Sequence, residues 1–332
     1  MVIAGEWELL TEETEEAARN AYAEGTRRNL VIQWDTYLEF CEYFRIKQIV
    51  PATSEVLSNY ITYLARGMKS PDTIQNYISG VKSIHTLMGE KTEQFDDMKA
   101  KLVLKGVAKQ LKHTKKRAEP ITPGLLLEMR EVVNWEEEVE VASWSAALLA
   151  FFTMMRKSNL VAESAKHVDK NKQLLRGDIK LGEETLMVYS KWSKTNQDGK
   201  RSVALPVAAH SRTEICPVEA YRGMTTKIPG KADGPAFIWR KHGKVKPLSY
   251  RKWQSTFRGW LSQIGQDPHL FSSHSFRRGG ATWAFKVQVP GEMIQKMGDW
   301  RSDCYKQYLD MPTEVRAEAA IRMARSVGGE RS

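Results

Sequence analysis

Two stretches in the C-terminal third decide how this sequence is interpreted: His274-Ser-Phe-Arg-Arg-Gly-Gly-Ala-Thr282 and Gly298-Asp-Trp-Arg-Ser-Asp-Cys-Tyr-Lys-Gln-Tyr308. The first sets a histidine three residues before an arginine, a spacing that puts both side chains on one face of a helix. Upstream, Phe152-Thr-Met-Met-Arg156 and Ser193-Lys-Thr-Asn-Gln197 add a second arginine and a lysine. Each element alone is a weak signal, but their joint occurrence in one chain is specific.

These residue types suit the chemistry of a DNA phosphodiester, which is anionic and gains charge in a pentavalent transition state. Arg156 and Arg277 can hold its non-bridging oxygens through charge-assisted hydrogen bonds. His274 can accept the proton of a tyrosine hydroxyl, which is a poor nucleophile because its pKa is about 10. Two alternatives stay open: Arg156 could end a core helix and extend to solvent, and His274 could cap a helix or fill a core.

In their order along the chain, these segments resemble the active-site boxes of the tyrosine recombinases. Enzymes of that family cut and rejoin DNA through a covalent phosphotyrosine bond. The Ser-Lys-Thr-Asn-Gln segment and the Trp-x-Ser-x-x-Tyr-x-x-Tyr ending are most similar to the eukaryotic Crypton and DIRS-like transposon enzymes. The motifs lie in the second part of the chain, and the resemblance implies that the N-terminal helices form the family's core-binding domain.

The resemblance also implies roles for further residues. Lys194 would protonate the leaving 5′-oxygen from a β-hairpin, with Lys191 as its rival on the opposite strand face. Trp300 stands where the family has His or Trp and would contact phosphate, unless it is a plain core residue. The family's spacing favours Tyr308 over Tyr305 as the nucleophile, and Tyr305 would then pack or contact phosphate. The implied catalytic set is Arg156, Lys194, His274, Arg277, Trp300 and Tyr308.

Two positions depart from the family pattern. Many members carry an acidic residue three positions after the first arginine, where this chain has Asn159. Asparagine can still form hydrogen bonds, but any charge pairing from that position is lost. Position 299 is Asp299 where another residue is usual. An acid beside a phosphate site is unfavourable unless it turns away to cap the next helix.

Hydrophobic periodicity predicts two structural parts. Residues 10–110 have the spacing of a bundle of about four or five helices. The segment 174–207 changes to strand-like alternation and predicts a three-stranded antiparallel sheet, with Asp198-Gly199 as a hairpin turn. The predicted fold class is therefore mostly α with a small antiparallel β-sheet (α+β). The predicted domains are a helical DNA-binding domain at 1–112, a basic linker at 113–124 and a catalytic domain at 125–332.

Charge indicates a polyanionic partner. The chain has 50 Lys and Arg against 40 Asp and Glu, a net charge of +10. Such a balance favours nucleic acid, here double-stranded DNA. The basic run 101–117 could be a strap along the DNA backbone, a solvated linker or a nuclear address. The segment 240–258 predicts a basic loop and helix that contact backbone phosphates, or else a solvated basic face.

Further DNA contacts are expected outside the active site. Arg278 follows Arg277 directly and turns about 100° away on a helix, so we assign it to the DNA backbone or to a carboxylate. The polar face of the 70–88 segment offers candidates for groove or phosphate contact. The full set of DNA-binding candidates is Lys69, Thr73, Asn76, Lys82, Lys105, Lys109, Lys115, Lys116, Arg117, Lys244, Arg251, Lys252 and Arg278.

Residues 313–327 have apolar positions every four residues and predict a terminal amphipathic helix. In the family a similar helix docks into a neighbouring protomer, which implies a dimer on one site and a tetramer in synapsis. Docking within the same chain is the alternative. The resemblance suggests a nuclear location if the chain is eukaryotic, and otherwise the cytoplasm with the DNA.

Other features exclude several classes. The three cysteines have no metal-ligand spacing, and no apolar run approaches the roughly 18 residues of a membrane span. We expect no metal, no cofactor and no membrane partner. Two other functions compete with recombination: a type IB topoisomerase-like enzyme that nicks and closes DNA, and a non-catalytic, transposon-derived DNA-binding protein.

Overall fold

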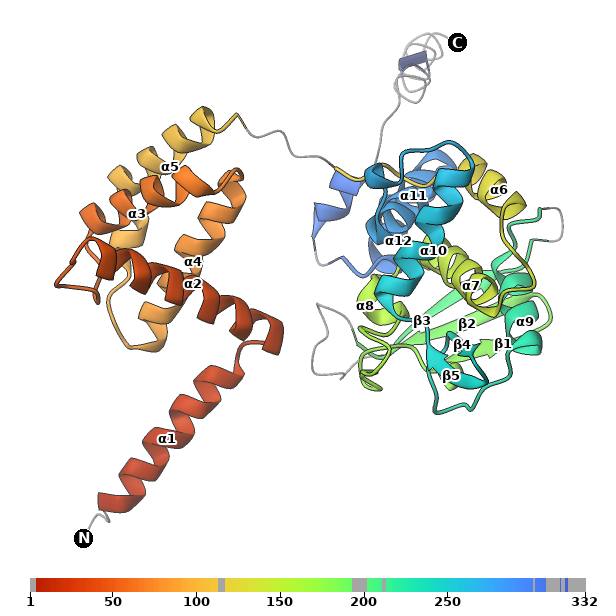
Figure 1. Ribbon diagram of the computed structural model, residues 1–332, viewed down its shortest axis with the longest axis horizontal. Coiled ribbons are helices and arrows are strands. Elements are labelled where there is room, and N and C mark those ends of the chain that lie inside the picture. The colour runs from red at the N-terminus through yellow and green to blue at the C-terminus, as the bar shows by residue number, and fades with distance from the viewer. Residues whose placement is uncertain are drawn as a thin grey trace, which may run out of the picture. The chain divides into compact units, whose positions relative to one another are not determined.

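The computed structural model describes residues 4–112, 117–192, 202–210, 213–300 and 302–308, together with three isolated positions at 317, 320 and 321 (Figure 1). The chain divides into two compact units, Met1–Lys116 and Arg117–Ser332. The helical content and the small antiparallel sheets confirm the predicted fold class.

Part of the segment that the sequence assigns to a linker is integral to the second unit. The amide of Glu119 donates to the carbonyl of Leu270 at 2.8 Å, and that of Ile121 donates to Ser275 at 3.0 Å. The Ile121 side chain is fully buried in the second core. Residues 113–116 of the expected linker, which include Lys115 and Lys116, lie outside the described residues.

The first unit is a helical bundle. Its elements are α1 (Ala4–Asn20), α2 (Glu24–Tyr43), α3 (Ser54–Gly67), α4 (Pro71–Leu87), the 3₁₀ segment η1 (Glu93–Asp96) and α5 (Met98–Gln110). Local sequence sets several starts: the Thr53 hydroxyl accepts from the Val56 amide, and Pro71 occupies the first turn of α4. Helix α2 packs on α4 and α3 on α5 around the buried side chains of Tyr37 and Tyr60.

The second unit is organised around α7 (Glu138–Thr153). This helix is apolar on nearly all sides and therefore buried almost throughout, against α9, α10, α11 and β4. The other helices are α6 (Pro123–Glu131), α8 (Lys157–Leu160), α9 (Pro217–Lys227), α10 (Tyr250–Gln263), α11 (Ser273–Lys286) and α12 (Gly291–Met297), with 3₁₀ segments η2 (Arg176–Asp178), η3 (Pro268–Leu270) and η4 (Asp303–Tyr308).

The expected three-stranded sheet is confirmed. Strands β1 (Ile179–Leu181), β2 (Thr185–Ser190) and β3 (Val203–Ala208) pair antiparallel in that order. One face of the sheet carries Leu186 and Val188 into the core, which fixes the register. The predicted turn at Asp198-Gly199 lies outside the described residues.

A second sheet was not predicted. Strands β4 (Ile238–Lys241) and β5 (Lys244–Pro247) form an antiparallel hairpin where the sequence suggested a basic loop. His242 and Gly243 make its turn with φ of 51° and 74°. Positive φ at both central residues is the geometry of a type I′ hairpin turn, for which His-Gly is an unusual pair. The strands were also hard to predict from the sequence because they are rich in lysine and arginine rather than in β-branched residues.

Helix α11 carries the first motif and lies against the end of α7. The Ser272 and Ser275 side chains form a capping box at its start. Gly279 and Gly280 permit the close approach, because a Cβ at these positions would lie 1.8 Å from the Ile121 carbonyl oxygen and 2.0 Å from that of Phe151. Gly280 therefore brings α11 against the end of α7, and Gly279 lets it approach Ile121, in the segment before α6.

The second C-terminal motif ends in a short helical segment. Residues Asp303–Tyr308 form the 3₁₀ segment η4, with Asp303 in its first turn. The amphipathic helix predicted over 313–327 lies outside the described residues apart from three exposed positions. Among the helices of the described ranges, none has both the length and the apolar character needed to span a bilayer.

Candidate active site

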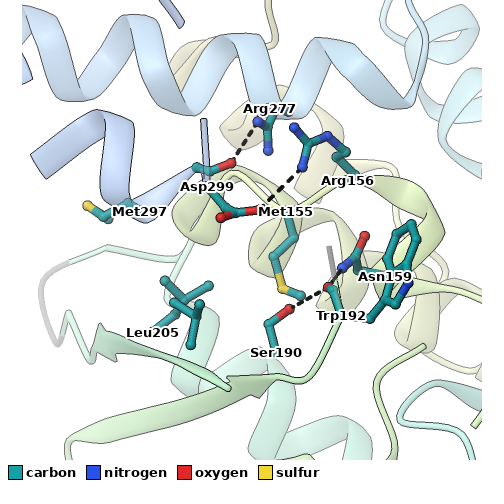
Figure 2. Close-up of a pocket in the computed structure, with 11 residues that line it drawn as sticks. Met155, Arg156, Asn159, Ser190, Trp192, Leu205, Arg277, Met297 and Asp299 are labelled. Atoms are coloured by element: carbon teal, nitrogen blue, oxygen red, sulfur yellow. Dashed lines mark hydrogen bonds and ion pairs between the residues drawn. The ribbon is translucent and has the colours of Figure 1, made fainter. Parts of the chain in front are cut away.

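A pocket in the second unit gathers residues from five separate segments (Figure 2). It encloses about 380 Å³, its solvent-open part included. Arg156 and Arg277, predicted to hold one phosphate, both line it. The full lining is Met155, Arg156, Asn159, Ser190, Trp192, Val203, Leu205, Arg277, Met297, Gly298 and Asp299.

Arg277 is held rigidly at the pocket wall. Arg277 is 2% exposed. Because an arginine guanidinium stays charged in proteins, this buried cation needs polar or aromatic groups around it. Nη1 donates to the Met154 carbonyl, and Nη2 donates to the Gly298 carbonyl at 2.7 Å. The guanidinium carbon also lies 3.8 Å from the centre of the Trp300 ring. Neutral carbonyls and an aromatic face thus orient the cation without neutralising it.

Arg156 enters the pocket from the turn after α7. Met154 ends that helix with φ of 53°, and Arg156 is the N-cap residue of α8. Its side chain is 22% exposed, and Nη1 lies 3.8 Å from Oδ2 of Asp299 (Figure 2). The solvent-directed alternative therefore gives way to a half-buried guanidinium that faces the pocket.

His274 lies in the first turn of α11, one turn before Arg277. The residue is exposed overall, and neighbouring protein shields only part of its imidazole. This partial desolvation lowers the pKa of His274, and the positive charges of Arg277, Lys157 and Arg156 lower it further. The neutral imidazole, which can accept a proton, is therefore favoured near neutral pH.

Lys157 is a site residue that the sequence analysis missed. It follows Arg156 directly, and its ammonium lies 3.3 Å from the centre of the Tyr250 ring. The cation–π contact fixes a flexible side chain close enough to depress the pKa of His274. A lysine next to the first arginine was the available signal, but adjacency on a helix does not imply a shared face.

Trp300 and Tyr305 both belong to a small core beside the pocket. Trp300 is 6% exposed and Tyr305 is 7% exposed, and their ring centres lie 6.1 Å apart. The turn before them is tight, because a Cβ at Gly298 would lie 1.7 Å from the Trp300 ring. Tyr308 is the last residue of η4, and its side chain lies outside the described residues.

The segment that leads toward Lys194 is anchored at Asn159. The Asn159 side-chain amide donates to the Trp192 carbonyl, which also accepts from the Ser190 hydroxyl at 3.2 Å (Figure 2). Lys191, the rival lysine, forms an ion pair of 2.5 Å with the buried carboxylate of Asp178. Lys194 itself lies outside the described residues.

The DNA-binding candidates have different surroundings. Lys82 forms an ion pair of 2.5 Å with Asp96, and Arg278 donates to the Ala118 carbonyl at 2.7 Å. The Arg278 contact ties the start of the second unit to α11, a structural role that the sequence did not indicate. Lys252 lies 5.6 Å from the Trp239 ring centre. The exposed candidates are Lys69, Thr73, Asn76, Lys105, Lys109, Arg117, Lys244 and Arg251.

The arrangement can bind one anion with two guanidinium groups next to a neutral imidazole. Over the part of the chain that the structure describes, no group of three or more His, Cys, Asp or Glu side chains could hold a metal ion. Residues 125–310 match the model of the phage integrase family. The chain belongs to this family. The match spans the pocket and both C-terminal motifs.

Relatives and solved structures are similar over most of the chain. An integrase/recombinase XerD homolog of Selenomonas ruminantium is 23% identical over 310 residues, which cover 91% of this chain and 86% of that protein. The fold is shared with the XerH recombinase in a post-cleavage complex with palindromic difH (TM-score 0.59, 16% identity, 93% of this chain and 82% of that one). It is also shared with the Tn1549 transposon integrase bound to circular intermediate DNA (TM-score 0.53, 13% identity, 82% and 85%).

Proposed function

We propose that this phage integrase family member is a site-specific tyrosine recombinase or transposon integrase that acts on double-stranded DNA. The observation that carries the proposal is the convergence of Arg156 and Arg277 on one pocket, with His274 one helical turn from Arg277. The similar proteins include recombinases and a transposon integrase, two of them bound to DNA. A net charge of +10 supports a DNA partner.

The proposed reaction conserves the energy of the cleaved bond. Tyr308 attacks a backbone phosphorus while His274 accepts its phenolic proton. Arg156 and Arg277 stabilise the charge that develops on the non-bridging oxygens. The bond to the 5′-oxygen breaks, Lys194 protonates that oxygen, and a 3′-phosphotyrosyl bond remains. The 5′-hydroxyl of a partner strand then attacks this bond, returns the proton and releases Tyr308.

The assembly and cellular location are part of the proposal. Exchange between two DNA sites needs protomers on each site, so we propose a dimer on one site and a tetramer in synapsis, joined by the 313–327 segment. The resemblance to Crypton and DIRS-like transposon enzymes stays a prediction from the motifs. If this resemblance holds, we propose that the protein acts in the nucleus; otherwise we propose that it acts in the cytoplasm, where the DNA is.

A paired-site assay tests the function. Sites are first selected by the full-length protein from random-sequence DNA and then cloned twice into one supercoiled plasmid. The expected product is a deletion or inversion between the two sites, which restriction mapping detects. Relaxation of single-site plasmids without exchange would identify a type IB topoisomerase-like enzyme. Binding without cleavage would identify a non-catalytic DNA-binding protein.

The fall in cleavage rate at acid pH should reflect the protonation of His274. Because desolvation and three nearby cations lower the pKa of His274, its neutral form persists below the ordinary value of about 6.5. The rate constant kcat/KM, which reports the free enzyme, should therefore fall only below about pH 6.5. Lys157→Gln removes one of those cations, so this fall should move to higher pH.

The measurement is the initial rate of covalent adduct formation at subsaturating DNA, from about pH 5 to pH 8. Lys170→Gln is the matched control, because that exposed lysine pairs with Asp233 and does not line the pocket. Its profile should overlay that of the unchanged protein. A fall at or above pH 6.5 in the unchanged protein, or one that Lys157→Gln leaves in place, would contradict the assignment of His274.

A further inference from the structure

Asp299 is the acid that the sequence pattern could not explain. It follows α12 with φ of 51°, in the left-handed region. The Asp299 amide donates to the Lys296 carbonyl at 3.1 Å, and the Trp300 amide donates to Gln295 at 3.0 Å. These two bonds form a Schellman motif that ends the helix. The position after such a helix end usually holds Gly, or Asn.

An aspartate at this position is locally unfavourable. A residue with a Cβ pays conformational energy in the left-handed region, where glycine does not. A carboxylate also lies badly at a helix C-terminus, where the backbone carbonyls already carry partial negative charge. The turn by itself therefore gives no reason for a carboxylate here. The reason must lie in what the side chain contacts.

The carboxylate reaches Arg156. Oδ2 of Asp299 lies 3.8 Å from Nη1 of Arg156, and the two side chains are 20% and 22% exposed. Within the described ranges, this ion pair is the one polar contact recorded for the Arg156 guanidinium. Arg277 differs, since two carbonyls and the Trp300 ring already hold it. Arg156 has Asp299.

Two cations that line one pocket repel each other, and a long arginine side chain has many rotamers. Asp299 counters both effects in the protein before DNA arrives. Because it faces only one end of the guanidinium, the remaining N–H groups stay available to a phosphate. Asn159, three residues after Arg156, cannot provide this charge and instead holds the Trp192 carbonyl.

We propose that Asp299 is a positioning residue for DNA cleavage, which holds Arg156 in the pocket beside Arg277 and supplies the carboxylate that position 159 lacks. The inference rests on the proposed recombinase function. Asp299 touches no reacting atom. Its effect should appear in the rate of cleavage at saturating DNA rather than in DNA affinity, because most of the affinity comes from backbone contacts elsewhere.

The test uses two substitutions that keep the turn, Asp299→Asn and Asp299→Gly. Asn and Gly are the residues that this backbone conformation favours, so the melting temperature should stay equal or rise. Single-turnover adduct formation at saturating DNA should fall by about 10-fold to 100-fold in both, since small misplacements of catalytic groups have effects of this size. The dissociation constant for a selected site should change by less than about threefold.

Glu292→Gln is the matched control, because Glu292 is an exposed acid in the first turn of the same helix, α12. It should cleave at the rate of the unchanged protein. Cleavage by Asp299→Asn and Asp299→Gly at or above the unchanged rate would overturn the inference and would show a carboxylate that competes with phosphate. An equal loss in binding and cleavage, or a loss in the control, would also overturn it. If the unchanged protein forms no adduct, the proposed function itself fails.

Discussion

Tyr308→Phe is expected to abolish the covalent protein–DNA adduct, with a loss of at least about 10⁴-fold, whereas Tyr305→Phe should retain it. A phenylalanine has no hydroxyl to attack phosphorus. Tyr305 is 7% exposed and packs with Trp300. Its hydroxyl also lies against Gly291, where a Cβ would come within 2.4 Å of it. This phenol packs in the small core and, unlike Arg277, does not line the pocket.

The measurement is trapping on a nicked suicide substrate, in which the short fragment that carries the free 5′-hydroxyl diffuses away after cleavage and the adduct accumulates. The label on the strand that carries the 3′-phosphate should migrate with the protein on a denaturing gel. DNA binding by Tyr308→Phe should be unchanged, because the lost atom takes no part in backbone neutralisation. An adduct that survives Tyr308→Phe and disappears in Tyr305→Phe would reverse the assignment of the nucleophile.

Much of the fold could be predicted because its signals are local. The helical period, Pro71 and the cap residue Thr53 mark the helices of the first unit within the sequence itself. The three-stranded sheet shows the alternation of a half-buried surface. The β4–β5 hairpin could not be predicted, because its turn is His242-Gly243 and its strands are rich in basic residues.

The site was predictable as a set of residue types but not as a set of contacts. Arg156 and Arg277 are 121 positions apart, and the resemblance to the tyrosine recombinases, together with phosphate chemistry, suggested that they share a phosphate. The groups that hold each guanidinium, two carbonyls for Arg277 and Asp299 for Arg156, come together only through tertiary packing, which no local sequence pattern encodes. Lys157 illustrates the same limit, since Tyr250, which fixes it, lies 93 positions away. Asp299 was visible in the sequence only as an anomaly.

The assignment of Arg278 shows how one helix position changes the outcome. The sequence assigned it to the DNA backbone or to a carboxylate, because it follows Arg277 directly and turns about 100° away on a helix. In the structure its guanidinium donates to the Ala118 carbonyl, on the segment that opens the second unit, and the DNA contact stays a prediction. Two adjacent arginines on α11 therefore serve different purposes: Arg277 faces the pocket, and Arg278 fastens the chain. This difference allows a matched comparison of the same substitution at neighbouring positions.

Arg277→Lys is expected to lower the rate of cleavage by about 10²-fold to 10³-fold, the usual effect of losing one donor to a developing oxyanion. A single ammonium cannot serve the Met154 and Gly298 carbonyls and a phosphate oxygen together, as the planar guanidinium can. The free energy of unfolding should also fall by about 1–3 kcal/mol, because a buried carbonyl loses its donor. Thermal melting and single-turnover cleavage below the melting transition measure the two effects separately.

Arg278→Lys provides the comparison, because the charge is kept and the residue lies outside the pocket lining. It should lower the melting temperature, through the weakened contact to Ala118, while cleavage at saturating DNA stays within a few-fold of the unchanged rate. A folded Arg277→Lys protein that cleaves at the unchanged rate would mean that this guanidinium serves the fold alone. Equal losses of cleavage in Arg277→Lys and Arg278→Lys would mean that any weakened contact of α11 impairs cleavage. The loss at Arg277 would then give no evidence for a direct contact between its guanidinium and the phosphate.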